Sequence, residues 1–268
     1  MLKRALILIL IVSLALMFTG CLNIHIGDGK MVIGNGEMES KTVSVEQDVT
    51  GLYNTGSIDV VIDPAMEGEA VIEGESNIIE LVELEQDAQG VLTVSFKESV
   101  SVSLSKGVTV RIPAVNGGTI EVNGSGSITL DGSDALLGDS FNVRVMGSGD
   151  IRLMAQAQKI STDINGSGNV NLDVKTSQFT AGIYGSGDVS VTGSADSIRV
   201  SIDGSGNVDA LGCDAASADV MVGGSGDIAV NVSSELTGSI NGSGDVLYTG
   251  NPGTVSVSNN GSGDLIKR

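Results

Sequence analysis

Apolar and polar residues alternate on both sides of a tripeptide, Gly-Ser-Gly, that recurs through the second half of the chain. The tripeptide begins at residues 124, 147, 166, 185, 204, 224, 242 and 261, at intervals of 18 to 23 residues. If its first glycine is called position i, then i−2 is Val or Ile in the first seven copies, and i+4 is Ile, Val or Leu in all eight. Alternation with a period of two is typical of β-strands with one buried face.

Each repeat is therefore expected to supply one strand before the tripeptide and one after it, with a variable loop such as residues 173–178 closing the unit. So small a unit cannot bury its apolar face alone, so consecutive units must stack. Parallel stacking adds one coil about every 4.8 Å. The sequence thus predicts an all-β fold, a parallel β-solenoid of coils of about 19 residues, over residues 124–268.

The tripeptide itself has two interpretations. Positions i and i+2 share the parity of the apolar positions, so both glycines are expected on the inward face, at a corner with no space for a Cβ atom. The alternative is a ligand-binding loop that is used many times. A phosphate loop is not indicated, because no GxxxxGK followed by Ser or Thr occurs in the chain.

Position i+3 forms an outward column of mostly acidic and amide residues. Its side chains are expected to satisfy backbone donors at the corner. The alternative is an outward ladder that binds divalent cations or cationic groups of a partner. No cofactor is expected beyond weak calcium binding by this ladder; GGSGDI resembles the calcium repeat GGxGxD, but Asp227 comes one position too early. After Ser127, the column consists of Asp150, Asn169, Asp188, Asn207, Asp227, Asp245 and Asp264.

The region before the solenoid lacks the regular spacing. Residues 41–123 contain alternating runs such as SIDVVID and VLTVSF, with DAQG as a hairpin turn and NIIEL as one helical turn. This N-terminal β region is expected to cap the first coil, because solenoid ends need covering. Residues 21–40 are Gly-rich and are expected to form a tether.

The first residues have the pattern of an export signal. Lys3 and Arg4 precede an apolar run, Ala5–Met17, which FTGC ends at Cys21. This indicates a signal peptide of the lipoprotein type over residues 1–20. The small residue before Cys21 resembles a lipobox, which implies cleavage and attachment of lipid to the thiol; the alternative is an uncleaved anchor. Both place the bulk of the chain outside the cytoplasm, held at the cell membrane or outer envelope.

Composition narrows the possible functions. The net charge is −19, or −21 without the two signal-peptide cations, so nucleic acid and anionic headgroups would be repelled. The absence of Trp and the scarcity of Tyr and Phe make a specific glycan pocket less expected. His25 is the single histidine, which excludes a histidine triad or a His-rich metal site. Cys213 is expected to be a buried thiol, and no catalytic residue or metal site is predicted.

The order of segments resembles one known family. GNGEMESKTVSVEQ, GLYNTGSIDVVI, EGESNIIELVELEQDAQGVLTVSF and VTVRIPAVNGGTIEVNGSGSI are followed by GSGD and GSGN repeats. This layout resembles the head GIN domain, a family labelled as a putative auto-transporter adhesin. The resemblance implies a β-solenoid-like fold on an exported, often lipid-anchored protein, and it implies no established catalytic residues.

Three classes of function remain. The favoured one is a non-catalytic surface or envelope protein that mediates adhesion or envelope interactions with an unidentified partner. The second is a self-assembling scaffold, since Leu265 and Ile266 lie on an incomplete coil whose open edge a second copy could cover, as an end-to-end homodimer detectable by light scattering. The third is a polysaccharide-acting β-helix enzyme with paired carboxylates, disfavoured because the loops are short.

Overall fold

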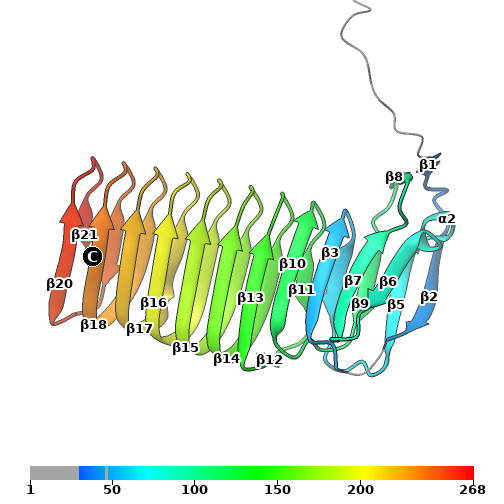
Figure 1. Cartoon of the computed structure of the whole chain (residues 1–268), viewed down its shortest axis with the longest axis horizontal. Helices are drawn as coiled ribbons and strands as arrows, with labels where there is room; N and C mark the ends of the chain where they lie inside the picture. Colours follow the sequence, from blue (N-terminus) through cyan, green and yellow to red (C-terminus); the bar gives the residue numbers. More distant parts are fainter. Residues whose placement is uncertain (1–29, 46–47) are drawn as a thin grey trace, which may run out of the picture.

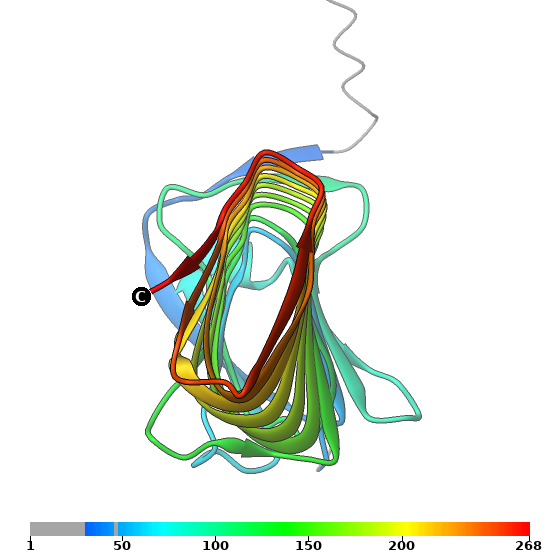
Figure 2. The same ribbon diagram turned by 90° about the vertical axis from the view of Figure 1, so that its left-hand side faces the viewer.

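The computed structural model describes residues 30–45 and 48–268, which form an elongated stack of β-coils with a cap at one end (Figure 1). Each coil is a flattened loop with two long sides (Figure 2). The expected all-β parallel solenoid is confirmed. The signal peptide, Cys21 and His25 lie outside the described residues. No helix in the described part of the chain is long and apolar enough to cross a membrane.

The described residues form one single-turn helix, α2 (Ser76–Ile79), at the position expected from NIIEL, and a series of strands. The strands are β1 (Lys30–Ile33), β2 (Met38–Ser44), β3 (Gly51–Gly56), β4 (Asp59–Ile62), β5 (Glu69–Glu75), β6 (Val82–Gln86), β7 (Val91–Phe96), β8 (Val100–Ser103), β9 (Thr109–Ile112), β10 (Gly118–Gly124), β11 (Ile128–Leu130), β12 (Leu136–Leu137), β13 (Ser140–Val145), β14 (Ile151–Ile164), β15 (Val170–Ile183), β16 (Val189–Ile202), β17 (Val208–Val222), β18 (Ile228–Ile240), β19 (Val246–Thr249), β20 (Thr254–Asn259) and β21 (Leu265–Lys267).

The regular coils differ from the expected pair of strands per repeat. From β14 to β18, a single strand of 13 to 15 residues runs from one tripeptide to the next. Residues 173–178, expected as a loop, lie inside β15, where all but Ser177 keep parallel pairing to β16. The strand therefore continues round the bend, because hydrogen bonds to the neighbouring coil persist through it.

The predicted inward positions form the core. Position i−2 is fully buried in the first seven copies, and i+4 is at most 1% exposed in them. Equivalent residues stack in register, as in Ile164, Ile183 and Ile202. Each apolar column thus runs along the stack and is buried by its neighbours above and below, and this burial is the main favourable contribution to folding.

Parallel stacking begins earlier than residue 124. Strand β3 pairs in parallel with β7 on one side and β10 on the other, and β4 lies likewise between β9 and β11. The coil made by β7 and β9 therefore lies outside the coil made by β3 and β4, against chain order. The solenoid thus extends into residues 41–123, and residue 124 is not its structural start.

Antiparallel strands close this end of the stack. Strand β6 pairs with β7, β5 pairs with β9, and β2 pairs with β5, all antiparallel. Strands β1 and β8 form a separate parallel pair. The segment expected to be a tether therefore contains strand β1 and the start of β2. At the far end, β20 and β21 each pair on one side only within the described residues, so the end-to-end dimer stays a prediction.

A buried carboxylate ties the cap together. Glu75 is fully buried, and its oxygens accept hydrogen bonds from the Gly36 amide (2.6 Å), the Ser105 hydroxyl (2.5 Å) and amide (3.1 Å), and the Lys106 amide (3.2 Å). These bonds, led by the Ser105 hydroxyl and opposed by burial, lower the pKa of Glu75 to about 2. Glu75 thereby joins the β1–β2 connection to the segment that follows β8.

Candidate functional site

The Gly-Ser-Gly tripeptides form the upper edge of the stack in Figure 1, and their geometry is structural. The carbonyl oxygen of Gly147 accepts hydrogen bonds from the amides of Ser167 (2.8 Å) and Gly168 (3.2 Å) in the next coil. A Cβ atom on Gly166 would overlap this same oxygen. Glycine is therefore required because neighbouring coils approach closely along the stack, rather than because an inward bend lacks space.

The i+3 column forms a continuous hydrogen-bonded ladder between coils. Oδ1 of Asp150 accepts from the backbone amide (2.8 Å) and the side-chain amide (3.0 Å) of Asn169, and Asp188 accepts in the same way from Asn207. Asn169 and Asn207 in turn accept the amides of Asp188 (3.1 Å) and Asp227 (2.9 Å), respectively.

The ladder continues to the last coil, where Asp227 accepts the amide of Asp245, and Asp245 accepts that of Asp264, each at 2.7 Å. This geometry matches the structural interpretation of the column. Within the described residues, no group of three or more His, Cys, Asp or Glu side chains could hold a metal ion. Calcium binding by the ladder stays a prediction, which thermal melts with calcium and with chelator can test.

Substitution within the ladder should be mildly destabilising. Asp188→Ala removes the acceptor of both Asn207 donors, so we expect a loss of about 1 kcal/mol in the free energy of unfolding, measured by chemical denaturation. Asp264→Ala is the matched control, because the Asp264 carboxylate accepts no hydrogen bond within the described residues. Equal losses for the two variants would contradict a structural ladder.

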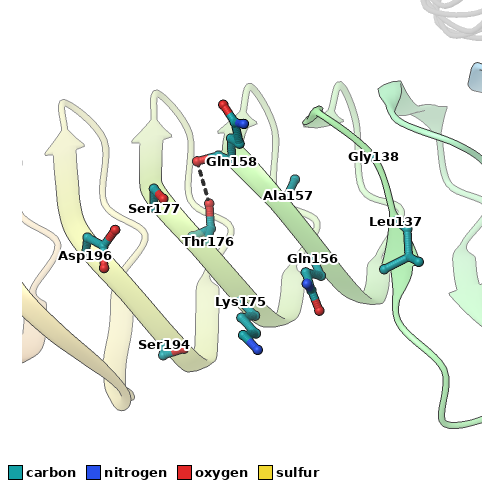
Figure 3. Close-up of a pocket in the computed structure, with 10 residues that line it drawn as sticks. All are labelled: Leu137, Gly138, Gln156, Ala157, Gln158, Lys175, Thr176, Ser177, Ser194 and Asp196. Atoms are coloured by element: carbon teal, nitrogen blue, oxygen red, sulfur yellow. Dashed lines mark hydrogen bonds between the residues drawn. The ribbon is translucent and has the colours of Figure 1, made fainter.

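A groove lies at the bend on the opposite edge of the stack (Figure 3). It has a volume of about 560 Å³ and is open to solvent. Its wall contains Leu137, which is 62% exposed, and Gly138. These residues belong to the 23-residue interval, whose extra length lets β12 run beside β14, with Leu137 opposite Gln156.

The groove floor is polar and comes from three successive coils. Gln156 and Gln158 lie on β14, Lys175 and Ser177 on β15, and Ser194 and Asp196 on β16. The Thr176 hydroxyl is almost buried and donates to the Gln158 carbonyl (3.0 Å), as Figure 3 shows. One lysine, one carboxylate and several amides and hydroxyls beside an apolar wall can form hydrogen bonds to a polar partner.

The sequence-predicted residues do not line this groove. The ladder lies at the tripeptide edge, and Cys21 is outside the described residues. Sequence reasoning missed the groove, although the one interval of 23 residues was a visible signal. Cys213 is buried, as expected, and burial, with Asp214 and Asp173, raises the pKa of its thiol to about 11, which leaves it unreactive.

A family model described as "Putative auto-transporter adhesin, head GIN domain" matches residues 49–252. The chain belongs to this family. Solved structures with the head GIN fold are similar over most of the chain, whereas no curated protein matches it. The resemblance inferred from the order of the sequence segments is therefore confirmed.

Three solved structures show how widely this head GIN fold extends. A protein of Parabacteroides distasonis described as a putative lipid binding protein has a TM-score of 0.78 at 24% identity, over 89% of this chain and 100% of its own. A putative adhesin of the same species has a TM-score of 0.78 at 23% identity with the same coverage. One from Parabacteroides merdae has a TM-score of 0.77 at 21% identity, over 88% of this chain and 99% of its own. At these identities, the likeness concerns the fold.

Proposed function

We propose that this head GIN protein is a non-catalytic, lipid-anchored adhesin that attaches outside the cytoplasm to a partner through the groove at Leu137. The main observation in support of this proposal is that the groove forms where one longer coil departs from an otherwise regular stack. The family and the β-solenoid fit an adhesin-like role. Lipid on Cys21, at the cell membrane or outer envelope, would hold the stack at the surface.

The stack suits presentation of a binding surface. Each regular coil pairs its backbone with the coils directly before and after it, so the solenoid presents a long side from which groove residues project. Glycoside hydrolysis needs a pair of carboxyl groups, and among the residues that the structure describes Asp196 is the single carboxylate that lines the groove. This supports binding rather than hydrolysis at this place.

An attachment assay tests the proposal. The full chain is displayed on a non-adherent bacterial host, and attached cells are counted on epithelial monolayers and on matrix-coated surfaces. We expect attachment several-fold above that of the empty host. The double variant Leu137→Asp, Lys175→Glu should return attachment towards background, because it adds a negative charge to the groove wall and reverses the lysine charge on the groove floor.

The control for this assay is Met38→Asp, a change of the same kind at a cap residue that is 50% exposed. It should leave attachment unchanged at equal surface expression, which immunodetection verifies. The proposal is wrong if wild-type display adds no attachment, or if the groove and cap variants behave alike.

A further inference from the structure

The aromatic ring of Tyr184 is exposed to solvent on a side of the solenoid away from the groove. Tyr184 follows β15 at position i−1 and is 57% exposed, whereas the other aromatic residues among those described are buried or half-buried. Exposed Tyr and Trp rings are enriched where proteins meet other molecules, because they offer an apolar face and a polar tip.

The Tyr184 ring packs against Gly182. A Cβ atom on Gly182 would lie 2.8 Å from Oδ1 of Asp163, 3.3 Å from Cε2 of Tyr184 and 3.6 Å from its hydroxyl oxygen. No other copy of the repeat has Tyr at i−1, and none has Gly at i−3. Residues that stacking requires recur in every repeat. Because Tyr184 and Gly182 occur together in one coil only, we infer that they serve a purpose other than stacking.

Polar side chains without partners surround the ring. Asn165 and Asp203 occupy position i−1 in the two adjacent coils, and Asp163 pairs in register with Gly182. None of these three side chains makes a hydrogen bond or ion pair in the described part of the chain. Their oxygens are free to accept hydrogen bonds from a ligand that also covers the ring.

Carboxylates outnumber cations on the face around the ring, as they do in the chain as a whole. Arg144 lies 4.0 Å from Glu121 and Arg199 lies 3.3 Å from Asp219, so both cations already have carboxylate partners, and Asp163 and Asp203 have no cationic partner in the described part of the chain. A hollow of about 180 Å³ lies on the same sheet, and Ser197, Arg199 and Asp219 are among the residues that line it. The excess of carboxylates disfavours a polyanion. An exposed ring beside free hydrogen-bond acceptors favours a ligand that combines an apolar face with hydroxyl donors.

We propose that this face binds a neutral, extended oligosaccharide that runs along the stack and packs one sugar ring against Tyr184. Coils repeat about every 4.8 Å, close to the length of one pyranose unit in an extended chain, so Asn165 and Asp203 would meet hydroxyls of the two flanking sugars. This site lies on different residues from the groove at Leu137 and goes beyond the adhesive role proposed for that groove.

Direct titration tests the proposal. The full chain, in a detergent without a sugar headgroup, is titrated by calorimetry with β-1,4-linked hexamers of glucose, mannose, xylose and N-acetylglucosamine. We expect at least one hexamer to bind, with affinity reduced about three- to tenfold by Tyr184→Ala and retained by Tyr184→Phe. Gly182→Ala should also weaken binding, since its methyl group would crowd both the Asp163 carboxylate and the Tyr184 ring.

Two controls make the result specific. Leu137→Asp, which disables the proposed groove, should leave the binding of the hexamer unchanged, so failure of the adhesive role and failure of this site remain distinguishable. Thermal melts confirm that each variant is folded. The proposal is overturned if no hexamer binds, if Tyr184→Ala binds as wild type does, or if hexalysine binds at Tyr184 while the sugars do not.

Discussion

Gly187→Ala should destabilise the protein by about 3 kcal/mol or more, the upper part of the range for forcing atoms into a packed interior. The added Cβ would overlap the carbonyl oxygen of Gly168 and lie 2.9 Å from its carbonyl carbon. Both are backbone atoms of a residue whose amide is hydrogen-bonded to Gly147 of the preceding coil, so they cannot rotate away as a side chain could. Chemical denaturation followed by circular dichroism measures the loss.

The matched control is Gly107→Ala, in the connection between β8 and β9. A Cβ atom there would meet no atom within 4 Å, and we expect a change within about 0.5 kcal/mol. If both variants lose equal stability, the cost comes from glycine's backbone freedom or from the unfolded state, and the close approach of coils would not explain the repeated tripeptide.

Acid should loosen the cap through Glu75. Its pKa is about 2 in the folded protein against an ordinary 4.5, so the ionised form is the one that folding stabilises. The contribution is present in full above about pH 4.5 and is lost as the pH falls towards 2. Glu75→Gln cannot ionise, so its melting temperature should lie below that of the wild type at pH 7, and the difference should shrink between pH 4.5 and 2.

Hydrogen exchange can show where this effect acts. Protection of the Gly36, Ser105 and Lys106 amides should fall in Glu75→Gln at neutral pH, while that of the solenoid amides is kept. Ser105→Ala, which removes the hydroxyl that lowers the pKa most, should give an intermediate result. A difference in melting temperature that stays constant down to pH 2 would contradict this role for Glu75.

The solenoid could be predicted because its signal is repeated. The parity of Ile164, Ile183 and Ile202 identifies one buried face, and eight copies make the period clear. The same parity led to a wrong reason for the glycines. Alternation tells whether a side chain points in or out, but not how closely the next coil approaches, and it is the carbonyl of Gly147 that excludes a side chain at Gly166.

The cap and the candidate sites could not be predicted, because they depend on contacts that do not recur at a fixed interval in the sequence. No pattern indicates that β3 lies between β7 and β10, since strand order in the non-repeating region follows from the shapes of unlike neighbours. The burial of Glu75 depends on donors 30 and 39 residues away in sequence. Leu137 and Tyr184 are visible in the sequence as departures from the repeat, and the structure adds what surrounds them.

Because each regular coil pairs its backbone with the coils on either side, the length of the protein can change only in whole coils. Duplication of one repeat of about 19 residues would lengthen the rod by about 4.8 Å without disturbing the cap or the last coil. Gene segments that encode single coils could therefore be gained or lost in evolution as whole units. The length of the rod could thus change in steps while the cap and the last coil are preserved.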